Sequence, residues 1–371
     1  MCGVAGLFTG CTALTPCPPP PPVPPGAGGP PGAGGSPYAG GPPYAAAPDD
    51  VPAAGSPYAP DPYRSPFGDW YERVAARPPL RRALVLPEGT APFSPALAPV
   101  TGHPLVRALP AAAQTRLLAL HAHRYLGFTA RLEHLVVNRT ALGIAHGTLG
   151  VDLPEEMRFD AYKLYCDEAW HALTAADLAR QLRHATGVAA PDAGTPAFLA
   201  RLAAVREAVG PRSAQLAELV FVVCSETLVS ATLPAGAEDP LMPAALRDTL
   251  RDHARDEVRH HAYFAAFLRL LWAGLDARQR RTAGRLVPRA VAAFLGPDLP
   301  ALRADLASAG LRPGEAEQVL AETHPPHAVA AYAREAARPA LGHFAELGVL
   351  DDPYVREELA AHGLSWDAHV T

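Results

Sequence analysis

The sequence predicts an all-α protein built on four long helices that form a bundle, with shorter helices added and a disordered tail before them. Three observations lead to this prediction. Apolar residues recur at intervals of three and four in four long segments, which is the period of an amphipathic helix. No segment sustains the alternation of apolar and polar residues that is typical of a strand, and no Gly-rich phosphate-binding loop occurs. Helices that each bury one apolar face are expected to pack into a bundle.

Residues 1–63 form the predicted tail, which is rich in Pro, Gly and Ala. They contain 18 of the 42 prolines and only three charged residues. A segment with so few bulky aliphatic side chains cannot bury enough apolar surface to offset the entropy lost on ordering. The sequence therefore predicts two parts, a disordered tail at residues 1–63 and a helical domain at residues 64–371.

The four long helices are expected at residues 115–149, 155–184, 214–232 and 243–273. A proline followed by two glutamates, as at Pro154, is typical of a helix start, and Pro234 is expected to end the third helix. The apolar face of the first helix is predicted at Leu117, Leu120, Leu132, Leu135, Val136 and Leu142. Shorter helices are expected after these, broken by Pro288, Pro297, Pro300, Pro313, Pro325, Pro326 and Pro339.

Composition and charge exclude several classes of protein. A formal net charge of −5 disfavours a nucleic-acid binder that relies on bulk electrostatics. No apolar run reaches the roughly 18 residues that a membrane span requires, and the N-terminus lacks the pattern of a secretory signal. The five cysteines are scattered, which indicates a reducing cytoplasm, and Cys166 and Cys224 are interpreted as small core residues.

One pattern of acids and a histidine occurs twice in the four long helices. A lone glutamate in an apolar helix is followed, 35 residues later in the first copy and 31 in the second, by a glutamate in an Asp-Glu-x-x-His run. Residues i and i+3 lie on one face of a helix, so the Glu and His of each run can bind one metal ion. Such a ligand set is that of ferritin-like dinuclear metal proteins. The two copies predict six ligands: Glu133, Glu168, His171, Glu226, Glu257 and His260.

The metal ions also explain how four acids could be buried together. Four carboxylates without cations would repel one another and lose their hydration, whereas two divalent ions cancel their formal charge. The aspartates that precede the paired glutamates, Asp167 and Asp256, are natural acceptors for the second N–H of a ligand histidine. The fold class is therefore predicted to be a ferritin-like four-helix bundle core with additional helices.

His253 adds a third histidine to this set, because it lies four residues before Glu257 and shares its helix face with Glu257 and His260. The complete set, with its His-x-x-x-Glu-x-x-His run, resembles the non-haem di-iron arylamine N-oxygenases over roughly residues 64–371. His261 is a competitor for the place of His260, but the first copy of the pattern has Ala172 at the equivalent position.

The resemblance implies two iron ions, O₂ as co-substrate and an external electron donor. The implied reaction oxidises an amine, in this family an arylamine, to the hydroxylamine and onward to the nitroso or nitro compound in antibiotic biosynthesis. No flavin or nicotinamide motif is visible, so a redox partner protein or a small reductant is expected to supply the electrons.

The substrate pocket is expected beside the metals, lined by neighbours of the ligands at helical spacing. A mostly apolar lining favours an aromatic or other apolar amine. Arg131 lies off the metal-facing side, so no cation for a substrate carboxylate is evident, and a different amine, free or carrier-bound, is considered. A homodimer is also considered. The predicted lining residues are Tyr125, Thr129, Val137, Val222, Val223, Ser230 and Phe264.

Three other functions use similar residues. A ferritin-like ferroxidase or iron store would not need His253 or the extra C-terminal helices. Another di-iron oxidase, such as a hydroxylase, a desaturase or an azoxy-forming enzyme, could use the same ligands on a different substrate. A non-catalytic scaffold acting through the Pro-rich tail is disfavoured by the complete ligand set.

Overall fold

The computed structural model describes residues 61–73, 81–190 and 194–366, except for the side chains of residues 230–232 and 234. All regular elements in these ranges are helical, which confirms the predicted all-α class. The predicted tail, apart from its last three residues, lies outside the described residues. The α-helices are α1 (Trp70–Arg73), α2 (Pro104–Arg107), α3 (Ala111–Leu132), α4 (Asn138–Ala145), α5 (Glu155–Thr186), α6 (Ala197–Val209), α7 (Pro211–Ala237), α8 (Ala244–Gly274), α9 (Ala277–Leu295), α10 (Leu299–Ser308), α11 (Pro313–Thr323), α12 (Pro326–Glu346) and α13 (Pro353–Ala361).

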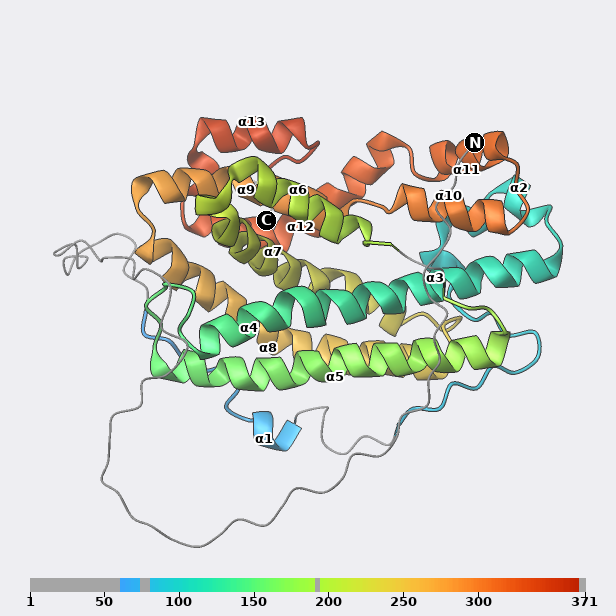
Figure 1. Ribbon diagram of the computed structural model, residues 1–371, viewed down its shortest axis with the longest axis horizontal. Helices are drawn as coiled ribbons and strands as arrows, with labels where there is room; N and C mark the ends of the chain where they lie inside the picture. Colours follow the sequence, from blue (N-terminus) through green and yellow to red (C-terminus); the bar gives the residue numbers. More distant parts are fainter. Residues whose placement is uncertain (1–60, 74–80, 191–193, 367–371) are drawn as a thin grey trace, which may run out of the picture. The chain divides into compact units, whose positions relative to one another are not determined.

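The bundle consists of two helix pairs. The first pair is α5 with α3, the π-helical segment η3 (Glu133–Val137) and α4, of which the last three follow one another along the chain, and the second pair is α7 with α8. Figure 1 shows α3 and α4 running beside α5 along its length. Contacts between α5 and α8 join the two pairs. Each pair therefore contributes one lone glutamate and one Asp-Glu-x-x-His run, as the repeated sequence pattern requires.

The ends of the long helices follow local sequence, with prolines as the main exception. α5 begins after Pro154 and ends at Gly187, whose φ of 69° is the left-handed conformation that glycine adopts most easily. The prediction that Pro234 ends the third helix is wrong, because α7 continues to Ala237. Pro288 and Pro339 likewise lie inside α9 and α12 and do not break them. A proline removes one backbone hydrogen bond, and the buried apolar faces of α9 and α12 outweigh that loss.

The first long helix contains a π-helical segment, η3 (Glu133–Val137), in which the N–H of Asn138 bonds to the carbonyl of Glu133. The extra residue in this turn rotates the following residues relative to a regular helix. Leu135 and Leu142, predicted on the buried face, are 51% and 39% exposed, because they lie about 200° and 180° around a helix from the inward-facing Glu133. Single π-helical turns are frequent at functional sites, and this one starts at a predicted metal ligand.

The remaining helices cover the bundle. α6, α9 and α12 pack against α7, and α13 packs against α9. A separate apolar cluster joins α10 and α11 to the start of α3, through Leu117, Leu306 and Val319. None of the described helices is long and apolar enough to cross a membrane.

The segment at residues 61–73 packs onto α5, although its first three residues were predicted to belong to the tail. The Tyr63 hydroxyl donates a hydrogen bond of 2.7 Å to Asp160, and the Phe67 side chain is fully buried. These contacts place Tyr63 with the helical domain.

Candidate metal centre

The predicted ligands converge in the interior of the bundle. One donor atom from each of Glu168, His171, Glu257 and His260 lies within 4.8 Å of the others, and Glu133, Glu168 and His253 form a second such group. Glu168 belongs to both groups, so the two candidate ion positions adjoin one another. All six side chains are at most 5% exposed, and they come from η3, α5 and α8.

Glu226, the seventh predicted ligand, lies in α7 and is 1% exposed. It belongs to neither group of converging donors among the described residues. Its pKa is raised well above the usual value by burial first and then by the charges of the nearby Glu257 and Glu168. The third long helix, α7, therefore brings a carboxylate to the same cluster, as the sequence pattern predicts.

The two lone glutamates differ electrostatically from the two paired ones. Burial, followed by the charges of Glu168 and Glu226, raises the pKa of Glu133 well above its usual value. Burial would also raise the pKa of Glu168, but the nearby His260 and His171 outweigh it and hold that pKa well below the usual value. Without metal, protons on the lone glutamates thus limit the negative charge of the cluster.

The paired histidines carry the complementary charge. Burial lowers the pKa of His171, but hydrogen bonds to Asp256 and Glu168 outweigh it and raise that pKa to about 10. The pKa of His260 is also raised well above its usual value, because Glu168 and Glu257 outweigh burial. Protons therefore occupy the positions where cations would be favourable, and metal binding is expected to displace them.

The atoms that face the interior of the cluster are suited to metal ions. The Nδ1 atoms of His171 and His260 lie 2.9 Å and 2.8 Å from oxygens of Glu168. The Nε2 atom of His253 lies 3.0 Å from Glu257 and 3.7 Å from Glu133. The second oxygen of Glu133 is buried and has no hydrogen-bond partner among the described residues, which is costly unless another group binds it. The residues present therefore fit a dinuclear metal site.

The two predicted outer acceptors contact the histidines, with the pairing crossed between the two helix pairs. Asp256 on α8 lies 3.3 Å from Nε2 of His171 on α5, and Asp167 on α5 lies 3.2 Å from Nε2 of His260 on α8. Each aspartate fixes the ring whose Nδ1 faces the cluster. The sequence indicates which aspartates take part, but not that each would serve the histidine of the other copy.

His261 lies outside the cluster. Its Nε2 atom is 2.8 Å from Nε2 of His343 on α12, so the structure favours His260 at the predicted position. Cys224 is buried, as predicted, but Cys166 is exposed and is not a core residue. The reason is helical geometry: Cys166 lies two residues before the inward-facing Glu168, about 200° around α5.

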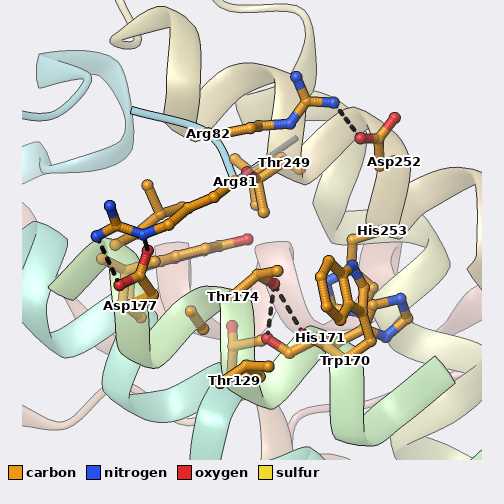
Figure 2. Close-up of a pocket in the computed structure, with 16 residues that line it drawn as sticks. Arg81, Arg82, Thr129, Trp170, His171, Thr174, Asp177, Thr249, Asp252 and His253 are labelled. Carbon is orange, nitrogen blue, oxygen red and sulfur yellow. Dashed lines mark hydrogen bonds and ion pairs between the residues drawn. The ribbon is translucent and has the colours of Figure 1, made fainter. Parts of the chain in front are cut away.

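A cavity of about 290 Å³ opens beside two of the histidines, His171 and His253. Its lining is mostly apolar and includes the predicted residues Tyr125 and Thr129. Figure 2 shows His171, His253 and Trp170 gathered at one side of this cavity, with Thr129 and Thr174 beside them. The cavity thus reaches the candidate metal centre directly.

Four predicted pocket residues do not line the cavity beside the histidines. Val137, Val222, Val223 and Phe264 are fully buried in the hydrophobic core, and none of them lines a described cavity. Their side chains pack in the hydrophobic core, because an inward-facing residue next to a ligand can contact a neighbouring helix instead of the cavity. The side chain of Ser230 lies outside the described residues.

Sequence reasoning missed the segment that contributes two arginines, Arg81 and Arg82, to the lining of the cavity. Arg81 binds Asp177 on α5 through two hydrogen bonds of 2.7 Å and 2.9 Å, and Arg82 pairs with Asp252 on α8. Arg131, considered for a substrate carboxylate, instead lines a different cavity and donates to the carbonyl of Gly127. Trp170 and Thr174 could have been found from their helical spacing to His171, but no local signal reveals the arginines.

These features define a class: a helical-bundle protein whose core holds four glutamates and three histidines in an arrangement suited to two metal ions, beside an apolar cavity. The family model described as P-aminobenzoate N-oxygenase AurF matches residues 79–348, and the chain belongs to this family. A 4-aminobenzoate N-oxygenase from Streptomyces thioluteus is 30% identical over 229 aligned residues, and the match covers 59% of this chain and 66% of that relative. The match thus spans slightly less than two thirds of the relative's length, and the predicted family resemblance is confirmed.

Proposed function

We propose that this protein is an O₂-dependent di-iron N-oxygenase that oxidises an amine, most suitably an arylamine. The observation that carries the proposal is the junction between the cavity and the cluster: His171 and His253 belong to the cluster and also line the cavity. An amine in the cavity would lie next to the metals without passing through the protein core. The family membership supports the same reaction class.

The proposed ligands are the seven residues predicted from the sequence, with Asp167 and Asp256 holding two of the histidines. Two bound irons would supply the redox chemistry that activates O₂. The first oxidation balances as R–NH₂ + O₂ + 2 e⁻ + 2 H⁺ → R–NHOH + H₂O. An external donor must provide the two electrons, and repeated cycles would give the nitroso and nitro compounds.

The protein's own residues bind and orient the amine. The apolar wall of the cavity excludes water and suits an aromatic ring, which would pack between α3, α5 and α8. Thr174 cannot readily donate to a substrate, because its hydroxyl lies 3.0 Å from the carbonyls of both Trp170 and His171. Thr129, one helical turn before Glu133, is the polar group best placed to contact the amine end.

The decisive experiment combines iron analysis with a peroxide-driven assay on a panel of arylamines. Peroxide supplies both oxygen and electrons, so no redox partner is needed. We expect about two irons per chain and a hydroxylamine, nitroso or nitro product detected by mass spectrometry. A protein that never takes up about two irons would exclude the proposal.

The same assay separates the alternatives. A ferroxidase would oxidise added Fe²⁺ and accumulate iron beyond the dinuclear site while leaving the amines unchanged. Another di-iron oxidase would oxidise a carbon atom of the panel compounds or couple two nitrogen atoms. The proposal includes two further points: the protein works in a reducing cytoplasm, and its nitro products belong to antibiotic biosynthesis. Expression in the native cell tests both points.

A further inference from the structure

The two His–Asp pairs beside the candidate metal centre end on chemically different residues. The carboxylate of Asp256, which binds His171, forms an ion pair with Arg259 on the same helix. The carboxylate of Asp167, which binds His260, instead accepts hydrogen bonds of 2.9 Å and 3.0 Å from Nε1 of Trp70. The two His–Asp pairs match each other, and the groups that hydrogen-bond or ion-pair with their aspartates differ.

Trp70 brings this second pair close to the surface. It lies in α1 and is partly exposed, and its neighbour Tyr71 is 48% exposed with its ring at an edge-on distance of 5.2 Å. From the indole N–H to Asp167 and on to Nε2 of His260, no hydrogen bond exceeds 3.2 Å. All the predicted ligands are at most 5% exposed, so a large electron donor cannot touch them directly.

We propose that electrons enter the metal centre at Trp70 and pass through Asp167 to His260. This inference rests on the proposed function, because N-oxygenation consumes two electrons from an external donor in each cycle. The reduction takes two one-electron steps. In each step one donor molecule loses one electron and one ferric ion would become ferrous. The indole and the carboxylate serve as a hydrogen-bonded path and are recovered unchanged, and no atom is transferred.

The difference between indole and guanidinium supports this direction of transfer. Both groups donate hydrogen bonds to an aspartate and hold it in place, so holding the aspartate alone does not require a tryptophan. An indole adds an extended π-system next to the surface, whereas the guanidinium of Arg259 carries a fixed positive charge. The Asp256–Arg259 pair is therefore suited to hold the ring of His171, and the Asp167–Trp70 pair is suited to carry electrons to His260.

The segment that carries Trp70 is anchored independently of the indole. Phe67 is fully buried and stacks on His260 with ring centroids 6.1 Å apart, and Tyr63 binds Asp160. Trp70→Phe should therefore keep residues 61–73 in place while it removes the N–H bond to Asp167. Trp366→Phe is a matched control, because Trp366 is also partly exposed but packs near Gly342 on α12.

The test uses the iron-loaded full chain under anaerobic conditions, with reduced methyl viologen as the one-electron donor. The readout is the rate at which the absorption of the ferric centre bleaches. We expect Trp70→Phe to slow this reduction, because the variant lacks the N–H bond that joins the surface to Asp167. Iron content and peroxide-driven product formation should stay at wild-type values, and Trp366→Phe should match the wild type throughout.

Each other outcome overturns the inference in a distinct way. Reduction of Trp70→Phe at the wild-type rate would show that electrons enter elsewhere. If Trp70→Phe lost reduction rate and peroxide-driven turnover equally, Trp70 would have a structural role only. If Trp70→Phe lost iron, Trp70→Tyr, which retains a ring and a hydrogen-bond donor, would be compared in its place. A wild-type protein that binds no iron would overturn the proposed function itself, before any variant is compared.

Discussion

The rings of His171 on α5 and His253 on α8 lie with their centroids 3.9 Å apart and their planes inclined by 33°. Both side chains are buried in the candidate metal centre, and both line the apolar cavity. This close pair is where the predicted ligand set and the substrate cavity meet. It depends on the contact between α5 and α8, which joins the two helix pairs of the bundle.

Replacement of His253 by alanine should remove a ligand and a wall of the cavity together. Because His253 faces Glu133 and Glu257, we expect the iron content to fall below about two per chain and N-oxygenation to be lost. Elemental analysis and product detection measure both effects. His261→Ala is the control, since His261 pairs with His343 and should bind iron normally. Unchanged iron and activity in His253→Ala would remove His253 from the ligand set.

Asp256→Asn should weaken metal binding without removing a ligand. The amide keeps the shape of the side chain but loses the charge that holds His171 and pairs with Arg259. Loss of such an outer partner lowers metal affinity or activity by about 10–100-fold. Iron titration against a chelator measures the change. Asp248→Asn is the control, because Asp248 is a partly exposed aspartate on the same helix. An affinity equal to that of the wild type would show that Asp256 does not support the site.

The charge of the preferred substrate follows from the mouth of the cavity. Arg81 and Arg82 are the cationic arginines among its described lining residues, and each is already paired with an aspartate. A substrate carboxylate would lack a partner there, which costs about 1–3 kcal/mol or more. We expect kcat/KM for 4-aminobenzamide to exceed that for 4-aminobenzoate by about tenfold.

Release of one arginine should reverse this preference. Asp177→Asn removes the carboxylate that binds Arg81, so the relative kcat/KM for 4-aminobenzoate should rise. Glu317→Gln, which breaks an exposed ion pair with Arg303 far along the sequence, is the control. A wild-type enzyme that already prefers 4-aminobenzoate would contradict the expectation, and would indicate that an arginine exchanges its aspartate for the substrate.

Lys163, the only lysine in the sequence, should be required for stability. Its Nζ atom lies 2.8 Å from Asp160, which is fully buried and also accepts a hydrogen bond from Tyr63. Lys163→Met leaves a buried carboxylate without its cation, which costs about 3–5 kcal/mol. Chemical denaturation measures this, and Arg180→Met, which removes an exposed ion pair, should cost less than about 1 kcal/mol. Equal small effects would show that Asp160 does not depend on Lys163 as its cation.

The contribution of His121 and His123 to the stability of the protein should fall on mild acidification. Burial lowers the pKa of His121 and of His123 below the ordinary value of 6.5. The folded state therefore binds fewer protons than the unfolded state, and stability is lost as the pH falls below 6.5. The loss is at most about 1.4 kcal/mol per pH unit for each histidine.

The measurement for this prediction is the unfolding midpoint Tm between pH 8 and pH 5 (about the range in which histidine titrates). The double variant His121→Gln, His123→Gln can still hydrogen-bond the carbonyls of Leu117 and Val188 but cannot titrate, so its Tm should decline less steeply. The difference between the two profiles cancels contributions from other histidines. Parallel profiles would show that these two do not control acid stability.

The fold class and the converging side chains could be predicted from the sequence because they depend on local geometry. The 3.6-residue period of a helix places Glu168 with His171, and His253 with Glu257, wherever the helices lie. The second and fourth long helices start and end within about two residues of their predicted limits, at the usual uncertainty of helix ends. Whether the converging side chains bind iron remains a prediction.

The predictions that failed depended on competition between local preference and packing. A proline weakens a helix, but Pro288 and Pro339 remain inside helices with buried apolar faces. Leu135 is exposed because it lies about 200° around the helix from the buried Glu133, and an apolar side chain there does not need a neighbour to cover it. Val222 and Val223 are inward-facing yet serve the core, since a sequence pattern shows burial but not the neighbour.

The sequence by itself determined the class of fold, the family and the set of acids and histidines, because residue type and spacing along a single helix fix them. Only the tertiary structure decided how these residues meet across helices. It paired Asp167 with His260 and Asp256 with His171, opened the cavity at His171 and His253, and brought Trp70 onto Asp167. Contacts between residues nearly a hundred positions apart depend on how the helices pack, and that packing depends on the whole core at once.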